Sequence, residues 1–290
     1  MKILIIVFLV VIFFMFPKFR CIVFHPILTI EYCIKDIYKY LRYCRWREYR
    51  QYGTLTIYTG LFGHGKTLML TKIARKIYKK YNNKKVYDFK DNKWKVQRIH
   101  IVSNVKLNDV EYIHLNALDD MLVYADDRFN DGVSVWIFMV DEMSTQINSR
   151  SYKENFTTEL LNILLTCRHY RFQILGTAQR FNHVDALVRQ VTSTADECNK
   201  LWRLVTVSVF DAWTVENTAD ITKIKPRRTK CYFIEDSDFL AYDTTAVVEN
   251  FKDNVKRGNI LTDREVLETL SVCQNEYSKL YLKKKFKKKL

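Results

Sequence analysis

Glycine is scarce in this sequence, with seven residues among 290, and neither an internal repeat nor a long low-complexity linker is visible. The seven cysteines are odd in number and scattered without a C-x-x-C pair, which excludes a disulfide framework and a cysteine-rich zinc site. The six histidines also lack the spacing of metal ligands. These absences favour a chain that folds in a reducing compartment around an ordinary apolar core.

Positive charge is in excess. Lys and Arg number 47 against 32 Asp and Glu, a formal net charge of +15, while 48% of the residues are hydrophobic. That hydrophobic fraction supports a substantial core, and the length fits one large domain with or without a small appendage. The cations indicate a polyanionic partner, either nucleic acid or an anionic membrane surface. A lysine-rich composition is also typical of an AT-rich genome, so charge alone does not choose between them.

Three of the seven glycines fall in one octapeptide, GLFGHGKT at 60–67, which has the spacing G-x-x-x-x-G-K-[ST]. An apolar, β-branched run at 55–59 precedes it and a helical pattern at 67–81 follows it, as a phosphate-binding loop requires. The backbone N–H groups of such a loop and the N-terminal end of the helix attract phosphate. The residues expected to contact a nucleoside triphosphate are Gly60, Leu61, Phe62, Gly63, His64, Gly65, Lys66, Thr67 and Leu68.

Two of these residues have predicted chemical roles. Lys66 would reach the β- and γ-phosphates, and the Thr67 hydroxyl would ligate Mg²⁺. The alternative interpretation is a chance glycine-rich turn that caps a helix. The agreement of strand, loop and helix favours the first interpretation, with ATP and Mg²⁺ as cofactors.

An acidic pair, Asp141 and Glu142, follows a continuous apolar run at 133–140 that is typical of a strand buried on both faces. Carboxylates at the tip of a central parallel strand face the phosphate loop at the carboxyl edge of the sheet. Asp141 would then hold Mg²⁺, directly or through water, and Glu142 would act as general base on the attacking water. Taken alone, the pair is equally compatible with a solvated turn.

Gln179 follows the next apolar run, 171–178, and is expected at the same edge of the sheet. Its amide would sense the γ-phosphate or orient water, which makes it the third predicted catalytic residue beside Lys66 and Glu142. In ring ATPases one arginine reaches the γ-phosphate of a neighbouring subunit. The sequence does not choose among the candidates, which are Arg150, Arg168, Arg171, Arg180 and Arg189.

Strand-like and helix-like segments alternate from residue 53 onward, which predicts an α/β fold with a parallel sheet sandwiched by helices. The expected strands are 55–59, 98–106, 133–140, 171–178, 201–212 and 230–234, and the expected helices are 67–81 and 157–169. We therefore predict an ATPase domain over 53–248 and a helical, polybasic tail over 249–290.

The N-terminus contains an uncharged apolar run at 3–16, which predicts a membrane anchor over 1–30. No small-x-small cleavage site follows, and the cations concentrate after the run, which favours a single span with the ATPase domain in the cytoplasm. A cleaved signal peptide and a buried helix are the alternatives. Residues 31–52 form a basic amphipathic pattern that would lie on an anionic leaflet or pack on the ATPase core.

Two clusters of cations follow the predicted catalytic residues. Residues 223–230 carry five cations in eight positions, and residues 283–289 carry six in seven. Either cluster would contact phosphates in a salt-dependent manner without reading sequence. The second cluster fits anionic lipid equally well, and a merely solvated tail is the commonest fate of such runs.

Several motifs together resemble the zonular occludens toxin-like (Zot-like) assembly ATPases of filamentous phages, within the FtsK/HerA class. They span about residues 54–240 in the order of that family. The matching segments are GLFGHGKT at 60–67, Val102-Ser103-Asn104-Val105, FMVDE at 138–142, Cys167-Arg168-His169-Tyr170, Gly176-Thr177-Ala178-Gln179 and Leu187-Val188-Arg189.

The resemblance implies a RecA-like P-loop NTPase fold with ATP bound between the subunits of a homo-oligomeric ring. It also implies virion assembly, extrusion or DNA movement at the host cell inner membrane, with single-stranded DNA or phage coat and assembly proteins as partners. Family members usually carry their membrane span after the ATPase domain, whereas the candidate span here precedes it.

The expected function is a membrane-anchored P-loop ATPase that couples ATP hydrolysis to one of these tasks. Two other functions remain open from the residues. One is a morphogenesis or interaction protein that binds nucleotide as a switch and hydrolyses little, and the other is a soluble nucleotide kinase with a cleaved leader. The intact Asp141–Glu142 pair and Gln179 argue against the switch.

Overall fold

The computed structural model describes residues 13, 16–116, 118–126, 129–143, 158–218 and 224–242. The chain divides into two compact units, one formed by Met1–Tyr49 with Asn83–Gln97 and the other by Arg50–Asn82 with Arg98–Leu290. The predicted tail at 249–290 and all but Phe13 and Phe16 of the apolar run at 3–16 lie outside the described residues.

The first unit combines helices with a β-hairpin. Its elements are α2 (Pro17–Phe24), α3 (Pro26–Arg42), the 3-10 helix η1 (Arg45–Arg47), β2 (Lys84–Asp88) and β3 (Lys93–Gln97). The Tyr43 ring, just after α3, stacks on Tyr87 of the hairpin with centroids 4.2 Å apart, and Phe89 and Trp94 pack around them. Among the described helices, none has both the length and the apolar composition that a membrane crossing needs.

The helical boundaries in this unit differ from the expected ones. The chain breaks at His25 because Pro26 disfavours a helical conformation in the residue before it, so no single helix continues through residues 16–30. The amphipathic helix expected within residues 31–52 instead runs from Pro26 to Arg42, and the left-handed backbone of Cys44 (φ 49°) separates it from η1. None of the residues of α3 is buried.

The second unit is built on an eight-stranded sheet with the order β10-β9-β8-β1-β7-β6-β4-β5. Pairing is parallel from β8 through β5, whereas β9 and β10 are added antiparallel. The α/β class and the mostly parallel sheet are as predicted. The strands are β1 (Thr54–Thr59), β4 (Ile99–Ser103), β5 (Ile113–His114), β6 (Val135–Val140), β7 (Phe172–Ala178), β8 (Thr194–Leu201), β9 (Leu204–Asp211) and β10 (Arg228–Phe233).

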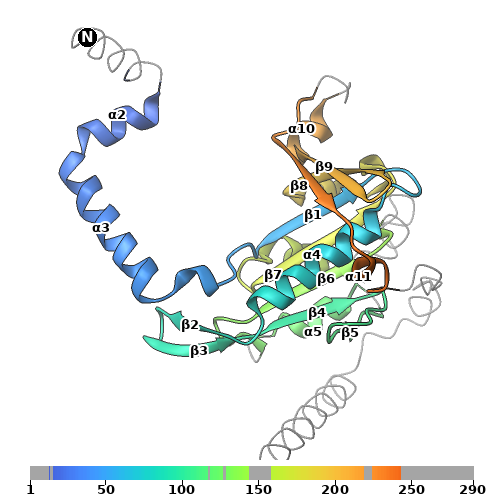
Figure 1. Ribbon diagram of the computed structural model, residues 1–290, viewed down its shortest axis with the longest axis horizontal. Coiled ribbons are helices and arrows are strands. Elements are labelled where there is room, and N and C mark those ends of the chain that lie inside the picture. Colours follow the sequence, from blue (N-terminus) through green and yellow to red (C-terminus); the bar gives the residue numbers. More distant parts are fainter. Residues whose placement is uncertain are drawn as a thin grey trace, which may run out of the picture. The chain divides into compact units, whose positions relative to one another are not determined.

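Helices cover this sheet. On one face α4 (Lys66–Tyr81) packs on β1, β4, β6 and β7, with α11 (Asp236–Phe239) beside it (Figure 1). In a hydrophobic core, Trp136, Phe138 and Val140 of β6 pack with apolar side chains of the remaining helices of this unit. Those helices are α5 (Asp120–Tyr124), α8 (Thr158–Thr166), α9 (Ala186–Val191) and α10 (Ala212–Asn217).

Strand β8 was not predicted, and it moves the boundary of the next strand. Residues 194–201 pair with β1 on one side and β9 on the other. The strand expected over 201–212 begins only at Leu204, because the chain turns at Trp202, whose φ is 55°. The β8–β9 hairpin brings Lys200 close to the phosphate loop.

Candidate functional site

The phosphate loop joins β1 to α4, and its glycines have backbone conformations or close contacts that disfavour a side chain. A Cβ atom at Gly60 would lie 2.8 Å from the carbonyl oxygen of Cys198, and Gly65 has a left-handed backbone with φ 80°. Among the described residues, no side chain forms a capping hydrogen bond at the start of α4. The first N–H groups of this 16-residue helix are thus directed at the loop, where an anion would be held.

Lys66 lies folded along its own loop. Its Nζ donates a hydrogen bond to the Leu61 carbonyl oxygen at 3.1 Å and lies 5.8 Å from the centroid of the exposed Phe62 ring. His64 has a different environment, because its Nδ1 lies 3.2 Å from the carbonyl oxygen of Cys198 on β8. The histidine therefore ties the loop to the neighbouring strand.

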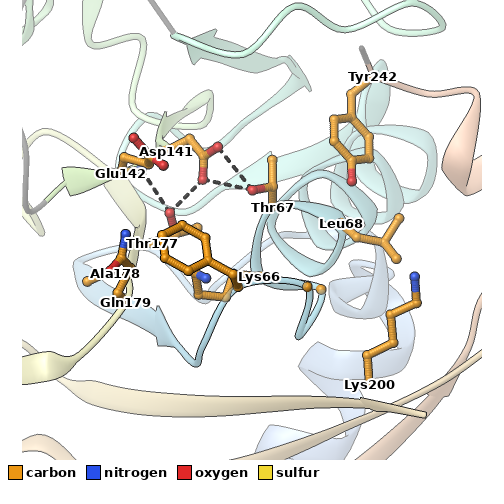
Figure 2. A pocket seen from close by; sticks show the side chains of 13 residues that line it. Lys66, Thr67, Leu68, Asp141, Glu142, Thr177, Ala178, Gln179, Lys200 and Tyr242 are labelled. Atoms are coloured by element: carbon orange, nitrogen blue, oxygen red, sulfur yellow. Dashed lines mark hydrogen bonds between the residues drawn. The ribbon is translucent and has the colours of Figure 1, made fainter. Parts of the chain in front are cut away.

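Asp141 is the polar centre of the site (Figure 2). The Thr67 hydroxyl donates to both of its carboxylate oxygens at 3.0 Å, and the Thr177 hydroxyl donates to Oδ1 at 2.5 Å. Only 7% of Asp141 is exposed, and this burial raises its pKa, while the two hydroxyls and the charge of Lys66 oppose the increase. Oxygen donors from one carboxylate and one hydroxyl fit Mg²⁺, which usually takes its other ligands from water and nucleotide phosphates.

The backbone around Asp141 and Glu142 is held on two sides. Asn104, after β4, donates through Nδ2 to the Asp141 carbonyl oxygen and accepts from the Asp141 N–H. The Glu142 N–H donates to the Thr177 hydroxyl at 2.8 Å. Glu142 has φ 52°, a left-handed conformation that a glutamate seldom adopts. These contacts direct the predicted base toward the pocket.

A cavity of about 370 Å³ opens over these residues. Of the predicted nucleotide contacts, those that line it are Phe62, Gly63, Gly65, Lys66, Thr67 and Leu68, and the predicted Asp141, Glu142 and Gln179 line it as well. Gly60, Leu61 and His64 shape the loop and are not among the lining residues. Gln179 reaches the cavity because β7 lies between β1 and β6, and its carbonyl oxygen accepts from the Gly60 N–H at 3.3 Å.

Four further lining residues were not predicted, namely Thr177, Ala178, Lys200 and Tyr242. Thr177 precedes Gln179 by two positions, and its place near a strand end was an available signal. Lys200 and Tyr242 enter from β8 and from the chain after α11. No local sequence pattern predicts that Lys200 and Tyr242 line the cavity, because their positions depend on contacts with segments distant in the sequence.

The candidate arginines separate into two groups. Arg189 forms a two-point ion pair with Glu216, through bonds of 2.5 and 2.9 Å, and Arg171 lies 4.7 Å from the Tyr52 ring centroid. Arg168 and Arg180 are exposed, and Arg180 directly follows Gln179. Arg150 lies outside the described residues.

The strand order, the phosphate loop after β1 and the acidic pair after β6 define the fold of a P-loop NTPase. No family model matches the chain, and no curated protein matches it. The structure is similar to the N-terminal domain of zonular occludens toxin from Neisseria meningitidis, with 18% identity and a TM-score of 0.44 over 66% of this chain and 100% of that one.

Two other solved structures are similar to this one at low sequence identity. The genome packaging NTPase B204 from Sulfolobus turreted icosahedral virus 2, solved with ATP-gammaS, has 10% identity and a TM-score of 0.41 over 64% of this chain and 100% of its own. EccC of Thermomonospora curvata (ATPases 2 and 3, with a signal sequence peptide) has 11% identity and a TM-score of 0.39 over 71% of this chain and 42% of its own.

The sequence motifs resemble those of the Zot-like P-loop ATPases, and one of the similar solved structures is a domain of zonular occludens toxin. Similarities with identities of 18% or less and TM-scores below 0.5 do not indicate the activity of this chain. Activity, substrate and assembly state therefore rest on the site itself.

Proposed function

We propose that this chain is a P-loop ATPase that hydrolyses ATP to drive virion assembly, extrusion or DNA translocation. The observation that carries the hydrolytic part is Asp141, held between the hydroxyls of Thr67 and Thr177, with Glu142 beside it over the phosphate loop. A loop for phosphates, an oxygen site for a cation and a carboxylate facing the same cavity are the parts that phosphoryl transfer to water needs.

Each residue has a defined task in this reaction. The loop N–H groups and Lys66 hold the phosphates, and Lys66 exchanges its bond to the Leu61 carbonyl for a phosphate oxygen. Thr67 and Asp141 would hold Mg²⁺, which supplies charge stabilisation at the phosphate oxygens. Glu142 accepts a proton from water as the water oxygen bonds to the γ-phosphorus and the bond to the β–γ bridging oxygen breaks.

The second polar group at the reacting end is Gln179. Its side chain lies on the same side of the cavity as Glu142 (Figure 2). An amide there orients the attacking water and responds to loss of the γ-phosphate. Because the chain continues directly into the exposed Arg180, a change at Gln179 would pass to the surface of the molecule.

We also infer a homo-oligomeric ring at the host cell inner membrane, with the N-terminal segment as anchor and the ATPase domain in the cytoplasm. The ring would use Arg168 or Arg180 in trans, because both are exposed, whereas Arg171 and Arg189 already have intramolecular partners. The net charge of +15 suits single-stranded DNA as cargo, and phage coat protein is the other cargo that the sequence resemblance implies.

ATP turnover by the full chain in detergent tests the hydrolytic proposal, with and without single-stranded DNA. We expect Lys66→Ala to lose binding and turnover, and Glu142→Gln to bind ATP while turnover falls at least about 100-fold. Lys76→Ala and Glu197→Gln, two exposed positions outside the cavity, are the matched controls. Undiminished turnover in Glu142→Gln would remove its role as base.

The same assay separates the remaining functions. Stimulation by DNA supports a DNA motor, whereas turnover that is indifferent to DNA points to a polypeptide cargo. A wild-type chain that binds ATP without hydrolysing it would be a nucleotide switch, and the motor proposal would fail.

A further inference from the structure

The segment 234–242, here called the strap, crosses α4 after the sheet ends at β10. It contains α11, which lies against α4 (Figure 1). At its start the Ile234 N–H donates to the Arg203 carbonyl oxygen of the β8–β9 turn at 2.8 Å. Midway, Lys200 of β8 places its Nζ 4.8 Å from the centroid of the Phe239 ring. The strap is thus attached to the strand that flanks the phosphate loop.

Buried ion pairs fix the strap to α4. Asp238 is buried and accepts hydrogen bonds from Lys72 and, at 2.9 Å, from Arg75 Nη1. Burial acts to raise the pKa of Asp238, but the bonds from Lys72 and the two cationic charges outweigh it, so the pKa is lowered. Arg75 also donates from Nε and Nη2 to Asp109, at 2.8 and 2.5 Å. One guanidinium therefore joins the strap to the loop after β4.

The far end of the strap is fixed beside β4. The N–H of Asn108 donates to the Ala241 carbonyl oxygen and its Nδ2 donates to the Leu240 carbonyl oxygen, both at 2.9 Å. Leu107 and Tyr242 form a β-bridge. These contacts determine where the Tyr242 ring lies. They place it in the wall of the cavity over the phosphate loop.

Tyr242 defines one side of that cavity together with Leu68 and Lys200. In Figure 2 these three residues lie on one side of the site, whereas Glu142, Ala178 and Gln179 lie on the other. The two sides differ in chemistry. The second has the groups that act on the γ-phosphate, and the first offers an aliphatic side chain, a flat aromatic ring and a flexible cation.

A nucleotide whose phosphates lie in the loop has to place its base and sugar elsewhere in the same cavity. We propose that Leu68, Lys200 and Tyr242 form the nucleoside subsite, with the Tyr242 ring packed on the base and Lys200 beside the sugar and first phosphate. This subsite rests on the proposed ATPase function and adds its base-binding residues. Stacking on an aromatic ring is worth about 1–3 kcal/mol per base, or roughly 5- to 150-fold in affinity.

The test compares two probes on the full chain by titration calorimetry, AMP-PNP and inorganic tripolyphosphate, both with Mg²⁺. Tripolyphosphate fills the phosphate loop but has no base. We expect the wild-type chain to bind AMP-PNP at least about tenfold more tightly than tripolyphosphate. Tyr242→Ala should weaken AMP-PNP about tenfold and leave tripolyphosphate unchanged, and Tyr242→Phe should bind both like the wild type.

Leu240→Ala is the matched control, because Leu240 is an exposed residue of the same strap. Equal affinity of the wild-type chain for the two probes would overturn the subsite even if Tyr242→Ala failed to fold. Loss of both probes to the same degree in Tyr242→Ala would also overturn it. A wild-type chain that bound neither probe would refute the phosphate loop itself, a different result from binding both equally.

Discussion

Asn104 and Asp141 exchange two hydrogen bonds across the carboxyl ends of β4 and β6. Asn104 Nδ2 donates to the Asp141 carbonyl oxygen at 3.0 Å, and the Asp141 N–H donates to Asn104 Oδ1 at 2.8 Å. Both residues are buried. The bonds fix the peptide on each side of Asp141, so the direction of Glu142 depends on a residue from another strand.

Asn104→Ala should therefore weaken both folding and catalysis. It removes two buried hydrogen bonds to the Asp141 backbone, which we expect to lower the free energy of unfolding by about 2–3 kcal/mol. Turnover should fall about tenfold while ATP affinity changes less than threefold. Urea unfolding and steady-state ATP turnover measure the two effects, with Asn199→Ala, an exposed asparagine, as control. Unchanged turnover would show that Glu142 is oriented without Asn104.

Thr177 can be tested by a pair of nearly isosteric changes. Its hydroxyl donates to Asp141 and accepts from the Glu142 N–H. Thr177→Val removes both bonds with little change in volume, and we expect turnover to fall at least about tenfold. Thr177→Ser keeps the hydroxyl and should retain most of the turnover. Equal loss in both variants would assign the effect to packing and not to hydrogen bonding.

Gly60 and Gly63 should differ in their tolerance of alanine, although both belong to the phosphate loop. A Cβ at Gly60 would meet the Cys198 carbonyl oxygen at 2.8 Å, whereas a Cβ at Gly63 would have no atom of the described residues within 4 Å. Gly60→Ala should abolish detectable ATP binding, and Gly63→Ala should weaken it only about threefold through backbone strain. Titration of each folded variant with AMP-PNP gives the comparison. The reverse order would contradict the loop geometry.

Asp196 should make stability depend on pH. Burial raises its pKa from 3.8 to about 6, against the opposing charges of Lys230 and Arg228. Between these values the folded protein keeps a proton that the unfolded chain has released, so the free energy of unfolding falls as pH rises. The total fall is about 3 kcal/mol. Asp196→Asn should remove it.

The measurement is the difference in unfolding free energy between Asp196→Asn and wild type at pH 4 and pH 7. A difference is needed because half-buried His100, whose pKa is lowered to about 4 by desolvation, acts with the opposite sign over an overlapping range. We expect the variant to gain about 2.5 kcal/mol relative to wild type from pH 4 to pH 7, because part of the total is already lost at pH 4. The same difference at both pH values would show that Asp196 is solvated.

The sequence predicted the half of the site that handles phosphate. The runs that became β1, β6 and β7 are largely apolar and buried. A glycine-rich loop follows β1, and polar residues follow β6 and β7, so periodicity and strand ends located the loop, the acidic pair and Gln179. Their assigned roles remain predictions, as do the membrane anchor and the ring.

The other half depended on distant contacts. Strand β8 reads TADECNKL, a polar segment that forms a strand because it fits between β1 and β9. Because the sequence did not predict strand β8, it did not predict that Lys200 lies beside the phosphate loop. Tyr242 is placed by contacts with residues such as Leu107 and by the strap's ion pairs with α4, which are more than 100 positions away in sequence. A local sequence pattern does not predict contacts over such separations.

Arg75 has a consequence for how this protein evolves. It is buried and serves two carboxylates, Asp109 and Asp238, that lie on different segments. Losing one member of a buried ionic group usually costs about 3–5 kcal/mol, whereas replacing the whole group by apolar residues is often neutral. Related chains should therefore keep all three residues or exchange all three together. Covariation of these three positions would identify relatives that share the strap.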